Sequence, residues 1–324
     1  HPKGRDLLLR LAARSDVVTE HYSPGVLDRA GLGYHDLKKV KPDIVLLSLS
    51  AAGATGPLND VVAYAPTMMS LGGMMGLTGY EGERVLMPWS GYGDANAAIH
   101  GAFAVMAALR YRNRTGRGQH IDLSEVDACA SLLGYPIMDY VMNRRVATTQ
   151  GNRSPFMAPH NIYPCQGEDA WVAIAVMTDA EFRGLCQAIG KPNLACDPRF
   201  ADAYLRVRNR AALDEAIAAW TRERAPRDAS DALQAAGVAA EPVMNIQDNY
   251  FDPHMQERGS FVEVEHPVIG NITLPAVAWR LKDTPAAIRR PAPTLGQHNE
   301  YVCRDLLGLS EGEVQALEQE KVFT

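Results

Sequence analysis

The chain has 324 residues, of which 47% are hydrophobic and 22% are charged, a composition typical of globular proteins and not of disordered, collagen-like or coiled-coil chains. Its 32 basic and 38 acidic side chains give a formal charge of −6, which argues against nucleic acid as a partner. No apolar run approaches the roughly 20 residues that a membrane span needs, so we expect no membrane-embedded part.

The cysteine and histidine patterns predict no metal site. The five cysteines are scattered, odd in number and without a C-x-x-C pair. This pattern argues against a disulfide framework or a thiolate zinc site and favours a reducing, cytoplasmic environment. The histidines show neither H-x-x-x-H nor H-E-x-x-H spacing, so we expect no histidine-based metal site either.

The first 50 residues predict alternating helices and strands. An apolar stripe predicts a helix over residues 5–14, and a strand is expected at 17–20. A short helix is expected to end near 41, and the almost continuously apolar residues 43–50 are typical of a strand buried on both faces. This order indicates an α/β protein. Because His1 leads directly into a helix, we also expect a further segment upstream.

The next hundred residues begin with a glycine-rich stretch, 51–93, that is typical of loops forming a site. It surrounds one expected helix containing the methionines of 68–75, which we interpret as core because methionine commonly fills gaps there. An alanine-rich helix is expected over 95–111, followed by a polar turn at 112–119 and a strand at 121–123. Ser124, with Asp127 three residues later, predicts another helix start.

After residue 150 the pattern changes. Strands are expected at 162–164 and 171–176, and helices at 179–190, 209–223 and 227–236. Residues 261–265 and 272–274 are typical of a hairpin, and two terminal helices are expected at 298–307 and 311–320.

Asp94 is the main candidate for chemistry, because it follows two glycines and precedes an apolar helix. Its position favours the role of an N-cap, whose side chain accepts hydrogen bonds from the first-turn amides. A carboxylate kept ionised at a helix N-terminus is also able to act as a nucleophile, so the two roles are compatible. The residues alone therefore indicate an α/β enzyme-like protein with Asp94 as a nucleophile or acid–base candidate.

Two common site types lack support in the same segment. Ser90 has no G-x-S-x-G context, which argues against a serine triad. The G-x-G formed by Gly91 and Gly93 lacks the third glycine or alanine of a dinucleotide fingerprint.

At these residues the sequence resembles the class III CoA-transferases, the group of formyl-CoA transferase and carnitine CoA-transferase. Residues 18–29, VTEHYSPGVLDR, are similar to the family's V-x-E-N-F/Y-x-P-G-x-x-x-R, and residues 115–122, TGRGQHID, to its T-G-R-G-Q-x-I/V-D. Gly93-Asp94, with the alanine-rich helix that follows, matches the segment that carries the family's catalytic aspartate. Further matches follow in order, and the resemblance covers essentially the whole chain.

The resemblance implies an α/β fold with a Rossmann-like large domain over residues 1–164, incomplete at its N-terminus. A smaller α+β domain over 165–290 and C-terminal helices over 291–324, returning to the large domain, are expected to follow. The family begins with a strand–helix–strand segment of about 70 residues, judged from typical unit sizes, which this chain lacks. Family members form interlocked dimers, so the resemblance also implies a homodimer.

The resemblance further implies a mechanism. Asp94 would attack an acyl-CoA thioester to form an anhydride, and the CoA thiolate would return to form an aspartyl-CoA thioester that an acceptor carboxylic acid displaces. Coenzyme A thioesters are thus substrates, and no tightly bound cofactor is expected. Backbone amides at Gly93 would stabilise the oxyanions. The expected CoA- and substrate-binding residues are His21 and Tyr22 in the CoA channel, Arg29 on the CoA phosphate, Tyr64 in the acyl pocket, and Ser154 and Phe156 in the loop over the site.

Two departures from the family pattern bear on specificity. His21 replaces the usual asparagine, and residues 153–158, RSPFMA, replace a mobile glycine-rich loop. Pro155 and Phe156 should make this loop stiffer and more apolar, so we expect an acceptor larger and more apolar than oxalate.

Two alternatives remain open. Related acyl-CoA racemases carry Gly-His-Asp where this chain has Ala63-Tyr64-Ala65, and tyrosine is a poor replacement for a general base. Racemisation is therefore the second hypothesis, and a non-catalytic CoA-binding partner subunit is the third.

Overall fold

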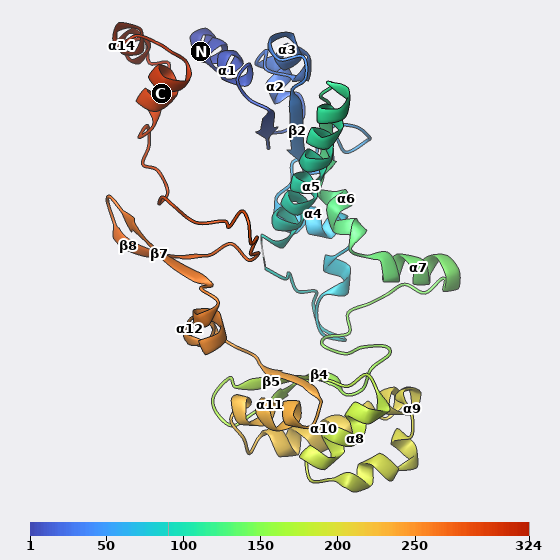
Figure 1. Ribbon diagram of the computed structural model, residues 1–324. Coiled ribbons are helices and arrows are strands. Elements are labelled where there is room, and N and C mark those ends of the chain that lie inside the picture. Colours follow the sequence, from blue (N-terminus) through green and yellow to red (C-terminus); the bar gives the residue numbers. More distant parts are fainter. Residues whose placement is uncertain (90, 324) are drawn as a thin grey trace. The chain divides into compact units, whose positions relative to one another are not determined.

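The computed structural model describes residues 1–89 and 91–323 and contains two compact units. The first unit comprises His1–Gly151 with Thr294–Thr324, and the second comprises Asn152–Pro293. Figure 1 shows their helices and strands in chain order, from blue at the N-terminus to red at the C-terminus.

The first unit is built on a parallel three-stranded sheet. Its strands are β1 (Val17–Glu20), β2 (Val45–Ser50) and β3 (His120–Ser124), in the order β1-β2-β3. Both pairings are parallel, with Val18 opposite Leu46 and Leu47 opposite Ile121. The central β2 is almost entirely apolar because helices cover both of its faces. The predicted α/β class is thereby confirmed.

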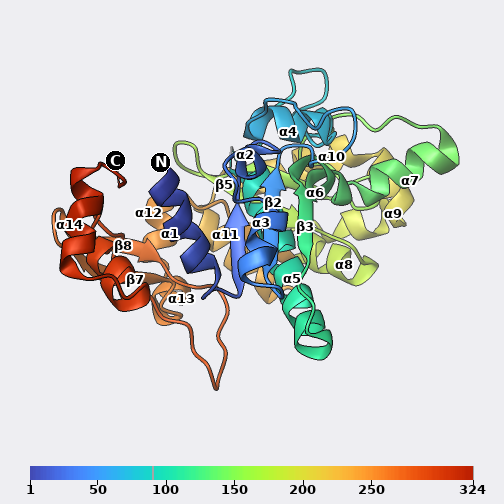
Figure 2. The same cartoon turned by 90° about the horizontal axis from the view of Figure 1, so that it is seen from above.

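Helices lie on both faces of this sheet. The helices of His1–Gly151 are α1 (Pro2–Ala12), α2 (Val26–Arg29), α3 (Tyr34–Val40), α4 (Ala65–Leu71), the 3₁₀ turn η1 (Met75–Leu77), α5 (Tyr92–Thr115), α6 (Glu125–Ser131) and α7 (Gly134–Asn143), and only some of them cover the sheet. On one face, Leu46 packs with Ala12 of α1 and Leu37 of α3. On the other, α5 crosses the sheet so closely that a Cβ on Gly101 would lie 3.0 Å from a methyl carbon of Leu47. Figure 2 shows α5 beside β2 and β3.

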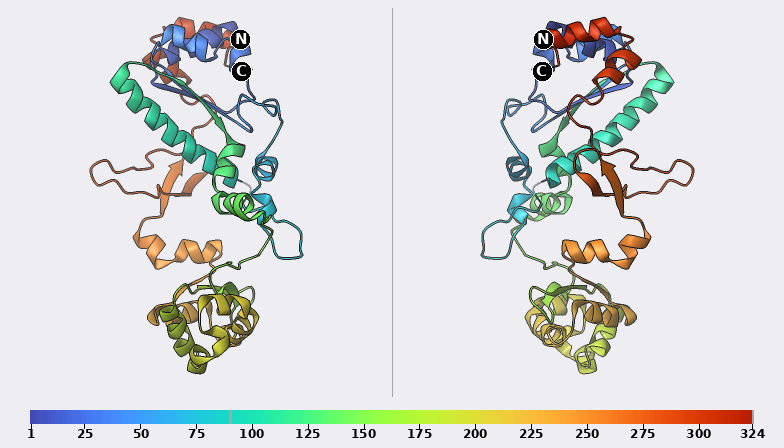
Figure 3. Two further views of the ribbon diagram at one scale, coloured as in Figure 1. Left: turned by 90° about the vertical axis from the view of Figure 1, so that its right-hand side faces the viewer. Right: turned by 90° about the vertical axis from the view of Figure 1, so that its left-hand side faces the viewer.

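The chain ends of the first unit pack together. The C-terminal segment forms the π-helix η4 (Tyr301–Leu306) and α14 (Glu311–Gln319). Cys303, Leu307 and Leu317 form a buried cluster against which Leu7 and Leu11 of α1 pack. The two ends of the chain are therefore neighbours, as the two views in Figure 3 show. The predicted helix over 298–307 is shorter than expected and is a π-helix.

The second unit pairs an antiparallel sheet with helices. Its strands β4 (His160–Pro164), β5 (Trp171–Ala175) and β6 (Ala239–Pro242) lie in the order β4-β5-β6. The helices are α8 (Asp179–Ala188), the 3₁₀ turns η2 (Pro192–Cys196) and η3 (Pro198–Phe200), α9 (Ala203–Arg208), α10 (Arg210–Thr221) and α11 (Pro226–Ala235). Phe182, Leu213 and Leu233 belong to their common core with β5.

The remainder of the second unit is α12 (Ile246–Phe251), α13 (Pro253–Glu257) and a hairpin of β7 (Phe261–His266) and β8 (Gly270–Pro275). Val262 pairs with Leu274 in that hairpin, as the sequence predicted. Antiparallel strands with separate helices make this unit α+β, which confirms the second half of the fold prediction.

Candidate active site

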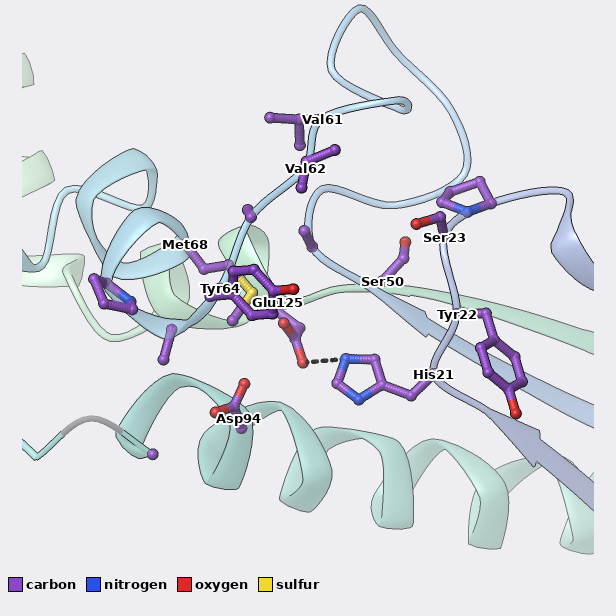
Figure 4. Close-up of a pocket in the computed structure, with 16 residues that line it drawn as sticks. His21, Tyr22, Ser23, Ser50, Val61, Val62, Tyr64, Met68, Asp94 and Glu125 are labelled. Carbon is purple, nitrogen blue, oxygen red and sulfur yellow. Dashed lines mark ion pairs between the residues drawn. The ribbon is translucent and has the colours of Figure 1, made fainter.

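A pocket of about 600 Å³ lies in the first unit, where the parallel strands end. The carboxyl edge of such a sheet is the usual ligand-binding edge of α/β proteins. The segment after β1, the end of β2, the start of α6, the first turn of α5 and the segment leading into α4 contribute to its wall (Figure 4). These lining residues are His21, Tyr22, Ser23, Pro24, Ser50, Ala51, Val61, Val62, Ala63, Tyr64, Ala65, Pro66, Met68, Gly91, Asp94 and Glu125.

Asp94 lines this pocket from the first turn of α5. The prediction that Asp94 is the N-cap is wrong: α5 begins at Tyr92, its N-cap is Gly91, and no side chain caps it. The helix begins earlier because Tyr92 and Gly93 already have helical backbone, which makes Asp94 its third residue. The carboxylate is therefore not used in capping, and the first turn of a 24-residue helix remains a favourable place for its negative charge.

Gly93 and Asn96 fix the packing beneath Asp94. A Cβ on Gly93 would lie 3.3 Å from Met69 Cγ and 3.5 Å from Cys129 Sγ, so α5 approaches α4 and α6 closely here. The Asn96 side-chain amide donates a hydrogen bond of 2.8 Å to the Ala128 carbonyl oxygen, which ties α5 to α6. Met69 is fully buried in this cluster, as the interpretation of the methionines as core predicted.

Glu125 is the group that the sequence reasoning missed. It is the first residue of α6, and Ser124 is the cap of that helix, accepting a 3.1 Å hydrogen bond from the Asp127 amide as predicted. An acidic residue after a helix cap is ordinary, so local sequence did not single it out. The one available signal is its place directly after a parallel strand, at the edge of the sheet where ligands bind.

The Glu125 carboxyl group contacts His21. Its Oε1 lies 3.0 Å from His21 Nε2, and the Glu125 side chain is 1% exposed whereas that of His21 is 57% exposed. The dashed line in Figure 4 marks this pair. Within the described part of the chain neither carboxyl oxygen has a hydrogen bond of good geometry. Burial is the largest effect and raises the pKa of Glu125, His21 opposes that rise, and the charge of Asp94 adds to it.

The other predicted binding residues of the first unit differ in placement. Tyr22 and Tyr64 line the pocket, with 59% and 78% of their surface exposed. Arg29 ends α2 and is exposed, but it is not among the residues that line the pocket. Its guanidinium lies against the backbone of Gly25, where a Cβ would be 3.0 Å from Nη1.

Ser154 and Phe156 belong to the second unit. The buried Ser154 hydroxyl accepts hydrogen bonds from the amides of Phe156 and Met157, at 3.1 and 3.2 Å. This turn leaves the Phe156 side chain 64% exposed.

Ser90 lies outside the described residues. Among residues 1–89 and 91–323, no group of three or more His, Cys, Asp or Glu side chains is arranged to hold a metal ion. In the same residues, no helix combines the length and apolar character needed to cross a bilayer.

Comparison with known proteins identifies the family. The model of CoA-transferase family III matches residues 1–299. The chain is 33% identical to the succinyl-CoA–D-citramalate CoA-transferase of Chloroflexus aurantiacus, over 99% of this chain and 80% of that protein. It is 27% identical to the mouse succinyl-CoA:glutarate CoA-transferase, over 98% of this chain and 72% of that protein.

Solved structures agree. A CAIB/BAIF family protein from Brucella suis superimposes with a TM-score of 0.83 and 30% identity, over 94% of this chain and 79% of that one. Rv3272 from Mycobacterium tuberculosis gives a TM-score of 0.80 at 25% identity, over 93% and 80% of the two chains. The predicted resemblance is confirmed, and the chain belongs to CoA-transferase family III.

Proposed function

We propose that this CoA-transferase moves CoA from an acyl-CoA donor to a carboxylic acid acceptor through covalent intermediates on Asp94. The observation that carries the proposal is the position of Asp94. Its carboxylate lies in the first turn of α5 but does not cap the helix, and it lines the pocket at the carboxyl edge of the sheet. A carboxylate so placed is a suitable nucleophile toward a thioester carbonyl.

The proposed steps balance without an added proton or oxidant. An Asp94 carboxylate oxygen attacks the thioester carbonyl, the carbon–sulfur bond breaks, and an acyl-aspartyl anhydride and a CoA thiolate result. The thiolate attacks the aspartyl carbonyl and releases the donor acid as its carboxylate, leaving an aspartyl-CoA thioester. The acceptor carboxylate attacks that thioester, whose carbon–sulfur bond breaks to give a second anhydride and the CoA thiolate. The thiolate then attacks the acceptor carbonyl of this anhydride, which forms the new acyl-CoA and frees the Asp94 carboxylate.

The residues around Asp94 support roles in binding. His21 and Tyr22 line the side of the pocket nearest β1, where we place the CoA thioester, and Tyr64 lines the acyl side. The amide of Gly93 is proposed to stabilise the oxyanions, since first-turn amides lack intrahelical acceptors. Arg29, exposed at the end of α2, is proposed to bind a CoA phosphate, and Ser154 and Phe156 to contact the acyl group.

The pocket wall supports a partly apolar acceptor. Val61, Val62, Pro66 and Met68 lie on the same side as Tyr64 and offer no charged group. The names of the relatives specify succinyl-CoA as the donor in transfers to citramalate and glutarate, so succinyl-CoA is the first donor to test.

The test is the intact mass of the protein after incubation with succinyl-CoA, followed by hydroxylamine. The wild-type chain is expected to gain a covalent adduct that hydroxylamine removes, whereas Asp94→Ala gains none. Asp127→Asn is the matched control, because it removes an exposed carboxylate outside the pocket. Absence of an adduct with a panel of acyl-CoAs, despite measurable CoA binding, would refute the mechanism, and exchange of the α-proton instead would support a racemase.

We also propose that the active form is a homodimer of interlocked chains. Apolar side chains of α5 and α7 are exposed on the single chain, among them Ile99, Phe103, Met106, Ile137, Met138 and Val141. Such a surface is typical of one buried by a partner. Light scattering should give about twice the chain mass of 35.3 kDa, and a monomer at micromolar concentration would contradict this.

A further inference from the structure

Glu125 is a buried carboxyl group that the proposed chemistry does not yet use. Its side chain is 1% exposed, lines the pocket beside Asp94, and has His21 as its sole charged neighbour of opposite sign among the described residues that line this pocket. Burying a carboxyl group without full hydrogen bonding costs free energy, so an apolar residue would serve packing better at this position. The contact with His21 is therefore the feature that needs a function.

We propose that Glu125 is a positioning residue of the CoA-transfer site, which acts through His21 by holding the imidazole in the pocket beside the departing CoA thiolate. This inference rests on the proposed function, because the thiolate is the leaving group of the attack by Asp94. Negative charge moves in that step from the Asp94 carboxylate to sulfur, and an imidazolium lowers the free energy of a nearby thiolate.

The geometry supplies what this role requires. His21 and Glu125 come from the two outer strands' carboxyl ends and face each other across the pocket floor, at 3.0 Å between Nε2 and Oε1 (Figure 4). Without the carboxylate, the His21 side chain, which is 57% exposed, has no buried partner to hold its orientation.

Other titratable groups lie near the Glu125–His21 pair, on the elements that pack against it. Asp94 faces it from α5, Cys129 lies one turn along α6, and Tyr22 and Tyr64 line the wall. The pKa of the Cys129 thiol is raised by burial and by Glu125 and Asp94, so that thiol stays neutral. β2 and α4 contribute Ser50 and Met68, which carry no charge. Asp94 and the Glu125–His21 pair therefore set the charge of the pocket.

The test compares wild type with Glu125→Gln, which keeps the shape of the side chain and removes its charge. In NMR spectra of ¹³C-histidine protein, assigned with His21→Asn, the His21 ring signals are expected to move in Glu125→Gln because the imidazole loses its charged partner. We expect kcat with succinyl-CoA to fall about 10- to 100-fold, with less change in KM. Glu125→Asp should restore part of the lost kcat.

Asp127→Asn is the control, since it removes a negative charge from the same turn of α6 without touching the pocket, and it should change neither the His21 signals nor kcat. Unchanged His21 signals in Glu125→Gln overturn the proposal, as does an unchanged kcat. The NMR measurement uses the resting enzyme and needs no turnover. Failure of the Asp94 mechanism would appear separately, as a missing covalent adduct on wild type.

Discussion

His21 and Glu125 meet across the end of the central strand, with Nε2 and Oε1 3.0 Å apart, although they follow the two different outer strands of the sheet. His21 comes directly after β1, and Glu125 comes directly after β3. Their contact therefore depends on the order and the parallel register of all three strands, and it brings the only fully buried acidic side chain among the described pocket-lining residues next to Asp94.

This burial predicts a pH-dependent stability. Because burial raises the pKa of Glu125 above its usual value of about 4.5, the folded chain binds the proton more tightly than the unfolded chain does. The contribution of Glu125 to the free energy of unfolding is therefore present below pH 4.5 and is lost as the pH rises through the folded-state pKa. Glu125→Gln stays neutral throughout, so its unfolding free energy relative to wild type should rise with pH over this window, as measured by urea denaturation at each pH.

Asp127→Asn should show no such trend, since its side chain is exposed on the same helix. A difference between Glu125→Gln and wild type that stays constant between pH 4 and pH 8 would contradict the buried, shifted carboxyl group.

Two glycines of the T-G-R-G segment should respond differently to alanine. A Cβ on Gly118 would lie 2.0 Å from the Ile44 carbonyl oxygen, where the chain enters β3 beside β2. This contact is with backbone, so a change of side-chain rotamer does not relieve the clash. We expect Gly118→Ala to lower the unfolding free energy by about 3 kcal/mol. Gly116 has open space but ends α5 at φ 70°, so Gly116→Ala should cost about 1 kcal/mol through backbone strain.

Gly134→Ala is the control for this pair. Its Cβ would meet nothing within 4 Å and its φ is ordinary, so the variant should be as stable as wild type or slightly more stable. Equal costs at Gly116 and Gly118 in urea denaturation would contradict the close approach of the chain to β2.

Two ion pairs of the second unit should differ in how much they contribute to the free energy of unfolding, because one contains a buried arginine and the other an exposed one. Arg206 is 1% exposed and is held by Asp179 at 2.7 Å, by the Phe200 carbonyl at 3.2 Å and by the Phe182 ring. Asp179→Ala leaves a buried guanidinium short of a counter-ion. Because the Asp179 side chain is itself 60% exposed, solvent screening limits the expected loss to about 2 kcal/mol in chemical denaturation.

The exposed pair of Arg199 and Asp197 provides the comparison. Arg199 is 58% exposed, so Arg199→Ala should change the unfolding free energy by less than about 1 kcal/mol. A cost for Asp179→Ala no greater than that for Arg199→Ala would show that Arg206 does not depend on its ion pair.

The rate at which each cysteine reacts with a thiol reagent should show which cysteines are buried in the two units. Cys129, Cys165, Cys186 and Cys303 are buried, and Cys196 is exposed. Burial raises the pKa of Cys186 to about 11 and raises those of the other three buried thiols as well, so they hold little of the reactive thiolate at pH 8. Ellman's reagent should therefore modify one thiol per chain rapidly, and Cys196→Ser should abolish this phase. Rapid modification of several thiols in the native protein would disagree with the fold.

Local sequence was sufficient to predict many of the helices and strands. The apolar residues before Ser50 predicted β2 because a strand covered on both faces must be apolar on both, and Ser124 predicted the start of α6 through its cap. Two elements, β6 and α7, were not predicted, because their local sequences do not favour the structure that they adopt. β6, with the sequence AAEP, has little strand preference and forms because β5 pairs with it. α7 was not predicted, since it begins with Gly134 and contains Pro136.

The sequence by itself also determined the family resemblance, through motifs that each lie within a dozen residues, and singled out Asp94 by its glycine setting. Only the tertiary structure decided that Asp94 is not a cap and that Glu125, apparently an ordinary first residue of a helix, is buried against His21. The physical reason is that burial and pairing of a charged side chain depend on which strands lie side by side and in what register. Residues distant in the chain set that arrangement, and no local spacing encodes it.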